Sequence, residues 1–189
     1  MARPKNPTHR DALLAAAART FAHEGLGAST ANIAKAAGVS AGTLFVHFES
    51  KSVLVNELYV SLKTEMGRAA IAGLTDDLGR RDRLQLMWNN WITWATMDPE
   101  RQRAVAHLSV AENITAHSRD AVSAAYAGIA QLVKAVTADG PMNGAPLPFV
   151  VALASALADA TVDDLIRAPD PTGHRRDLAF EALWRALAG

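Results

Sequence analysis

The chain has 189 residues with 19 basic and 19 acidic side chains, so its formal net charge is zero, and 50% of its residues are hydrophobic. This length is sufficient for one large domain or two small ones with a hydrophobic core. The absence of cysteine excludes a disulfide framework, a thiolate zinc site and a cysteine nucleophile. The balanced charge excludes a protein that holds nucleic acid by bulk positive charge alone.

Neither the N-terminal residues nor the most apolar stretch indicates a membrane protein. The N-terminal residues are charged and no apolar segment follows them, so we expect no secretory signal. The most apolar stretch, 147–158, is too short to span a bilayer and is soon followed by three aspartates. We therefore expect a cytoplasmic protein that contacts no membrane.

The composition favours helices throughout. Alanine is abundant, and runs in which β-branched or aromatic residues alternate strictly with polar ones are absent, so the sequence predicts an all-α fold. Glycine and proline divide the chain into about nine helices. The breaks that we predict are Gly25 to Gly27, Gly38, Gly79, Asp98-Pro99, 139–144 and 169–171.

Charge is distributed unevenly along the chain. Residues 1–51 hold six Lys or Arg against three acidic residues, whereas residues 52–189 hold 13 against 16. A basic segment ahead of an acidic body suggests an anionic partner for that segment. A solvated surface explains an excess of three charges equally well.

A helix-turn-helix pattern follows the first predicted helix. Ala34 is small enough for two helices to cross closely, and Gly38 can adopt the positive φ of a tight turn. Leu44, six residues after Gly38, is expected to point into the core. Thr30 and Ser40 are suitable N-caps for the two helices. This spacing is typical of a DNA-binding motif whose second helix enters the major groove, although an ordinary helical hairpin can share it.

The pattern is part of a longer segment, ALLAAAARTFAHEGLGASTANIAKAAGVSAGTLFVHFESKSVL. This segment closely resembles the DNA-binding domain of the TetR family of bacterial transcriptional regulators. The resemblance covers about residues 9–58. It implies three N-terminal helices that form a DNA-binding domain at 1–52, and a helical ligand-binding and dimerisation domain at 53–189. A fourth helix, at about 50–66, would link the two domains.

The resemblance also implies contacts with DNA. The recognition helix would begin near Ser40, with Ala41 and Thr43 at the base edges and Gly42 close to the DNA backbone. Lys51 would bind a phosphate at the start of the fourth helix. The complete set of DNA-binding residues implied is Thr30, Ser40, Ala41, Gly42, Thr43, Phe45, His47 and Lys51.

Two positions depart from the usual family pattern. Phe45 stands where the family often has Tyr, and Ala41 stands where it often has a basic or polar residue. Because few polar groups would face the base edges, we expect DNA recognition to rely more on apolar contacts, on DNA shape, or on an N-terminal arm containing Arg3 and Lys5.

The predicted helix at 82–97 contains three of the four tryptophans. A tryptophan stripe is typical of a hydrophobic core, but the resemblance implies that this region surrounds a ligand cavity. Charges are scarce on the apolar faces of this helix and of the expected helices 99–114 and 118–138. We therefore expect an aromatic or apolar ligand that is neutral, or weakly cationic and balanced by Glu112 or Asp159. The candidate ligand-binding residues are Trp88, Trp91, Trp94, His107 and Tyr126, with core or boundary roles as the alternative.

The two last predicted helices indicate a dimer. The helix at 148–168 is apolar around most of its circumference, which predicts burial on a core side and on a partner side. Together with the final helix it resembles the family's four-helix interface, and we expect a homodimer through these two helices. The apolar residues of the final helix are Leu178, Phe180, Leu183, Trp184 and Leu187, and Leu183 is the interface position that we expect.

The function that these features predict is ligand-responsive transcriptional regulation. The homodimer would bind a palindromic operator in double-stranded DNA, most often as a repressor, and a small apolar molecule would release it. The alternative is a ligand-independent or architectural DNA-binding protein controlled by a protein partner. We expect no enzyme, no catalytic residue, no metal and no cofactor, because His107 and His117 lie on different predicted helices and no nucleophile motif is present.

Overall fold

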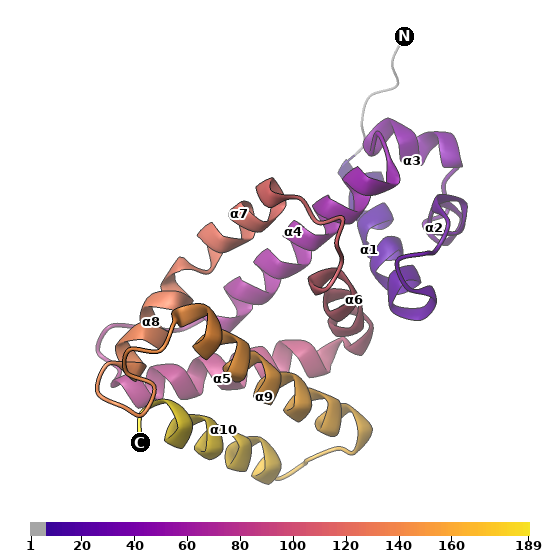
Figure 1. Cartoon of the computed structure of the whole chain (residues 1–189). Coiled ribbons are helices and arrows are strands. Elements are labelled where there is room, and N and C mark those ends of the chain that lie inside the picture. The colour runs from indigo at the N-terminus through magenta and orange to yellow at the C-terminus, as the bar shows by residue number, and fades with distance from the viewer. Residues whose placement is uncertain (1–6) are drawn as a thin grey trace. The chain divides into compact units, whose positions relative to one another are not determined.

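The computed structural model describes residues 7–189, which form ten α-helices and no strand (Figure 1). This confirms the all-α fold, with one more helix than the nine or so predicted from the sequence. The helices divide between two compact units. The first unit comprises the described residues up to Lys63 together with Asp98–Val122, and the second comprises Thr64–Met97 and Ser123–Gly189. The predicted domain division at 1–52 and 53–189 stays a prediction.

The first unit contains the N-terminal helices and the middle of the chain. Its helices are α1 (Pro7–Glu24), α2 (Thr30–Ala36), α3 (Ala41–His47), the greater part of α4 (Lys51–Ala70), α6 (Pro99–Ser109) and α7 (Ala116–Ala125) up to Val122. The second unit contains the end of α4, α5 (Arg80–Met97), the end of α7, α8 (Ala127–Thr137), α9 (Leu147–Arg167) and α10 (His174–Leu187).

Glycines and serines set the ends of the short N-terminal helices. Gly25 follows α1 with φ at 71°, and Gly38 takes φ at 69° in the turn between α2 and α3, as the sequence predicted. Ser40 caps α3, because its hydroxyl accepts a hydrogen bond from the backbone N–H of Thr43. The predicted cap of α2 was wrong by one residue: Ser29, in extended conformation, is the N-cap and Thr30 is the first helical residue.

The core of the first unit lies between α1, α3, α4 and α6. Phe21 and Leu13 of α1, Leu44 of α3 and Leu108 of α6 are fully buried. An ion pair between Arg10 and Glu57 joins α1 to α4. Helix α1 also packs against α2 and α3, and α2 packs against α3, so α3 has a defined outward face.

Two predicted helices are shorter in the structure. The helix expected at 99–114 ends at Ser109. Val110 lies in a turn in which the N–H of Ala111 donates to the carbonyl oxygen of Leu108. The helix expected at 118–138 is two helices, α7 and α8, separated at Tyr126. The ring of Tyr126 lies against Gly67, where even a Cβ would come within 2.9 Å of the ring.

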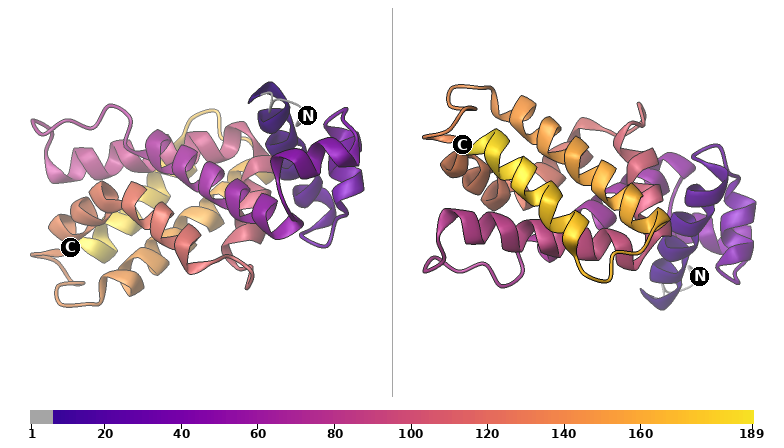
Figure 2. Two further views of the ribbon diagram at one scale, coloured as in Figure 1. Left: turned by 90° about the horizontal axis from the view of Figure 1, so that it is seen from above. Right: turned by 90° about the horizontal axis from the view of Figure 1, so that it is seen from below.

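The core of the second unit is centred on α5, which packs against α8, α9 and α10. Trp88 is only 1% exposed, its ring centroid lies 6.5 Å from that of Phe180, and its indole N–H donates to the carbonyl of Arg176. Helices α9 and α10 lie side by side, as the view from below in Figure 2 shows. One face of α9 therefore belongs to the core of its own unit.

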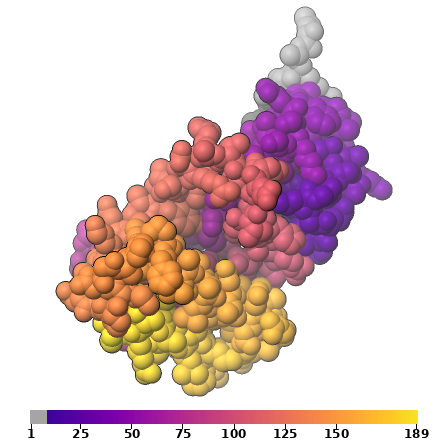
Figure 3. Space-filling model, viewed as in Figure 1, coloured from indigo at the N-terminus to yellow at the C-terminus, as the bar shows by residue number. Residues whose placement is uncertain are grey.

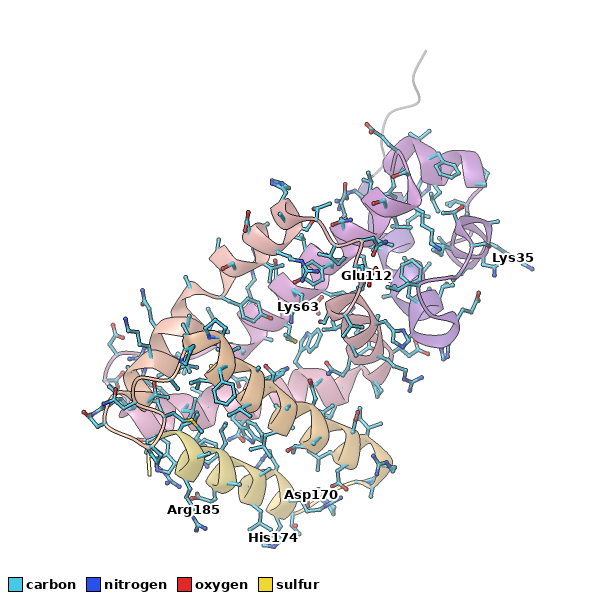
Figure 4. All side chains as sticks on the ribbon, in the orientation of Figure 1. Lys35, Lys63, Glu112, Asp170, His174 and Arg185 are labelled. Atoms are coloured by element: carbon cyan, nitrogen blue, oxygen red, sulfur yellow. The ribbon has the colours of Figure 1, made fainter. Side chains whose placement is uncertain are left out.

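The start of α10 is fixed by a carboxylate. Asp170 accepts hydrogen bonds from the backbone N–H groups of Arg175 and Arg176. Burial acts to raise the pKa of Asp170, but these bonds and one from Thr172 outweigh it, so the pKa lies below its usual value. Figure 4 shows Asp170 at this end of α10, with His174 and Arg185 projecting from the helix.

The structure corrects the predicted interface position on the final helix. Phe180, Leu183 and Leu187 are 1%, 4% and 2% exposed within a single chain, so they belong to the core of the second unit. Leu178, by contrast, is 55% exposed. Residues three and four apart share a face of a helix, which explains why the three buried residues line up and Leu178 does not.

Membrane-spanning helices and metal-binding clusters are both absent from the described residues. Between residues 7 and 189, no helix is long and apolar enough to cross a membrane. Over the same residues, no group of three or more histidines and acidic residues could hold a metal ion.

Candidate functional site

Helix α3 presents a mostly apolar outward face. Leu44 is fully buried beneath the helix. Gly42, Phe45 and Val46 are exposed, the two larger side chains by 48% and 46%. At 100° per residue, Gly42 and Val46 lie on the side opposite Leu44, so they point away from the core. Ala41 is exposed at the start of the same helix.

Thr43 is partly buried and helps to begin the helix. Its hydroxyl lies 2.9 Å from that of Ser40, and its backbone N–H donates to the same Ser40 oxygen at 3.1 Å. The sequence placed Thr43 and Ala41 at the base edges and did not single out Val46, which follows Gly42 by four residues on the same helix face.

Lys51 stands at the start of α4, where the sequence placed a phosphate contact. Ser50 accepts a hydrogen bond from the N–H of Val53, so it caps the helix and leaves other N–H groups of the first turn free of intrahelical partners. The ammonium group of Lys51 lies 6.0 Å from the centroid of the Phe21 ring. This cation–π contact fixes a positive charge near the helix start.

The remaining predicted DNA-binding residues differ in accessibility. Thr30 is partly buried at the start of α2, and His47 is only 9% exposed, which leaves little of its ring for a phosphate. Lys35 projects from α2 into solvent (Figure 4). The predicted arm residues Arg3 and Lys5 lie outside the described residues.

The predicted ligand-binding residues do not all lie in one unit. His107 belongs to the first unit, where its Nδ1 lies 2.9 Å from the carbonyl oxygen of Phe21. The three tryptophans of α5 and Tyr126 belong to the second unit. Of the two balancing carboxylates that we considered, Glu112 is exposed in the first unit and Asp159 is exposed in the second.

The three tryptophans of α5 have different surroundings. Trp88 is a fully packed core residue. Trp94 is partly buried and its indole N–H donates to Glu65 at 3.2 Å. Trp91 is partly buried against the same core, and its indole nitrogen is inaccessible to solvent without a hydrogen-bond partner among the described residues. A donor that is buried without an acceptor is costly, because its hydration is lost and not replaced.

Each unit has a surface depression. In the first unit, a groove of about 590 Å³ lies between α4 and the start of α7 and includes Asn56 and His117. In the second unit, a depression of about 220 Å³ lies beside Asp170 and Arg176. Neither of these two is lined by the predicted ligand-binding residues. The amide of Asn56 bonds the backbone of Asn113 and Thr115 and thereby fixes the loop before α7.

The comparisons with known proteins agree with this geometry. The family model for bacterial regulatory proteins of the tetR family matches residues 13–58, which include α2, α3 and the start of α4. The chain carries a TetR-family DNA-binding domain. The resemblance inferred from the sequence is therefore confirmed for the TetR segment. The HTH-type transcriptional regulator BetI of Agrobacterium fabrum is 40% identical over 79 residues, which is 41% of this chain and 38% of BetI.

Solved structures extend the likeness to the whole fold. A TetR-family transcription regulator from Shewanella sp. PV-4 is 28% identical with a TM-score of 0.85, covering 96% of this chain and 98% of that one. A second regulator, from Marinobacter aquaeolei VT8, is 23% identical with a TM-score of 0.86 and 96% coverage of both chains. FadR from Bacillus subtilis, solved with stearoyl-CoA, shares 15% identity at a TM-score of 0.71, covering 93% and 98%. The last two comparisons show the fold alone.

Proposed function

We propose that this protein is a DNA-binding transcriptional regulator that acts as a homodimer on a palindromic operator. The observation that carries the proposal is the exposed second helix of the helix-turn-helix, α3, held on the α1–α4 base of a TetR-type domain. A seven-residue helix with an exposed face fits the major groove, and two such helices related by two-fold symmetry read a two-fold symmetric site. The direct test is selection of genomic fragments by the full-length chain, followed by footprinting.

Repression is the mode of action that we propose. A protein that occupies a site overlapping a promoter blocks transcription without any further contact. A reporter gene placed behind the selected site should be repressed when the protein is present. Activation of the reporter would contradict the repressor role and leave DNA binding intact.

Lys51→Ala is expected to weaken binding to all DNA sequences by a similar factor. Loss of one phosphate contact should also reduce the slope of log affinity against log salt concentration by about one. Fluorescence anisotropy with a selected site and a scrambled site, at several salt concentrations, measures both quantities. The matched control is Lys35→Ala, which removes an exposed lysine of α2 and should change the slope less. A change of sequence preference with an unaltered slope would contradict the phosphate role of Lys51.

The second unit is the proposed site for a small ligand that releases the DNA. The support is Trp91, whose buried indole N–H has no acceptor among the described residues and whose ring lies beside an apolar core. A ligand with a carbonyl or ether oxygen would satisfy this N–H, and an aromatic or apolar body would suit the surrounding surface. Release follows only if the ligand binds the DNA-free conformation more tightly than the DNA-bound one.

Binding of such a ligand is expected to change the intrinsic tryptophan fluorescence. A panel of neutral aromatic amides and ketones, with the matching carboxylic acids and stearoyl-CoA as charged comparisons, tests the proposed ligand class. Trp91→Phe keeps an aromatic ring but removes the N–H, so it should weaken binding about tenfold, the worth of one hydrogen bond. Trp184→Phe on α10 is the matched control and should bind normally. A response to the charged compounds alone would contradict a neutral ligand.

A further inference from the structure

The outward surface of α3 lacks polar side chains suited to reading base edges. Its exposed residues, Ala41, Gly42, Phe45 and Val46, offer only hydrocarbon and backbone. The hydroxyl group of Thr43 is partly buried and is bonded to Ser40 at the cap of the helix. The surface that a major groove would meet is therefore apolar.

The neighbouring helix α2 supplies few of the missing polar groups. On α2, the side-chain amide of Asn32 donates to the carboxylate of Glu24 at 3.0 Å. His47, the last residue of α3, is 91% buried. Ser29 accepts from the N–H of Asn32 and is occupied as a cap. Apart from the exposed Lys35 and the partly buried Thr30 of α2, the polar side chains beside α3 are therefore bonded locally or buried.

The base edges of the major groove carry one apolar group, the C5 methyl of thymine. We propose that α3 recognises its operator through thymine methyl groups, which Val46 and Ala41 contact, rather than through hydrogen bonds to bases. Val46 is suited to this role because it is 46% exposed, points away from Leu44 and is branched. This inference rests on the proposed DNA-binding function. It adds the chemistry that the recognition helix reads.

The test uses the full-length chain and a site selected from genomic fragments. Each thymine of the site is replaced in turn by deoxyuridine, which removes the methyl group and keeps every hydrogen-bonding group. Affinity should fall about fourfold for each methyl that α3 contacts, the worth of one buried carbon group. Replacements should be silent at positions outside the two half-sites. A site whose affinity is unchanged by all the replacements would overturn the proposal.

Recognition by DNA shape is distinguished by a second set of duplexes. Inosine in place of guanine removes a minor-groove amino group and leaves the thymine methyl groups untouched. Methyl recognition predicts little change in affinity with inosine. Loss of affinity with inosine together with indifference to deoxyuridine would show that shape determines the specificity and would contradict our inference.

A pair of valine variants assigns the contact to α3. Val46→Ala should weaken binding to the unmodified site severalfold. Deoxyuridine at the contacted position should then lower the affinity of this variant no further. The matched control is Val110→Ala, which truncates an 83% exposed valine beyond the end of α6 and should keep the full deoxyuridine penalty. If deoxyuridine lowers the affinity of the Val46→Ala variant as much as that of the wild type, Val46 does not contact the thymine methyl group. If no site is selected at all, the proposed function fails; a selected site insensitive to deoxyuridine contradicts only this inference.

Discussion

The double variant Phe149→Glu, Leu178→Glu is expected to sediment as a monomer and to bind the operator at least about a hundredfold more weakly than the wild type. The exposed side of α9 and α10 is the reason. Phe149 and Leu178 are 53% and 55% exposed in a single chain. Helix α9, orange in Figure 3, also carries Val151, Leu153 and Ile166, each more than a third exposed. Exposed apolar side chains on two adjacent helices are expected at an interface with a second copy.

The two substitutions are chosen to spare the fold of the monomer. Both side chains reach solvent in the isolated chain, so a carboxylate there keeps its hydration until the partner arrives. Leu183→Glu, at the interface position expected from the sequence, would place a charge in the core of the second unit and is expected to unfold it. Val110→Glu serves as the control, since it adds the same charge at an exposed valine of the first unit. Analytical ultracentrifugation at micromolar concentration measures the oligomeric state of each variant. A double variant that remains a dimer would show that the interface lies elsewhere.

The helix-turn-helix was predictable because its signals are local. A positive φ at Gly38 and a hydroxyl cap at Ser40 are both dictated by residues within one or two turns. The cap of α2 was misplaced because Ser29 and Thr30 are adjacent residues with similar capping ability, and the backbone conformation decides between them. Errors of one residue at helix ends follow from this degeneracy.

The errors in the body come from contacts between residues far apart in the sequence. The apolar spacing continues through Tyr126, so the sequence predicted one helix, whereas the ring of Tyr126 lies against Gly67, 59 residues away. Periodicity also cannot tell a core side from a partner side. It therefore assigned Leu183 to the dimer interface together with Leu178, although only Leu178 is exposed. The unpartnered indole of Trp91 likewise depends on packing that no spacing rule describes.

Gly140→Ala is expected to lower the free energy of unfolding by about 2–3 kcal/mol, as overpacked sites do. Gly140 follows α8 and lies against the end of α10. A Cβ at this position would overlap the carbonyl oxygen of Leu187 and come within 2.6 Å of the Cα of Ala188. Both obstacles are backbone atoms, so no side-chain rotation relieves them. The φ angle of Gly140 is not positive, and the cost is therefore steric rather than conformational.

Gly128→Ala is the matched control, because it is the same substitution in a permissive position. Gly128 lies in the first turn of α8, and a Cβ there would meet nothing within 4 Å. Alanine favours the helix over glycine, so this variant should gain up to about 1 kcal/mol. In thermal unfolding, the two variants should shift the midpoint in opposite directions, by several degrees downward for Gly140→Ala and by up to a few degrees upward for Gly128→Ala. Equal midpoints would mean that the chain around 139–144 moves away from α10 at little cost, contrary to the close contact that the structure shows.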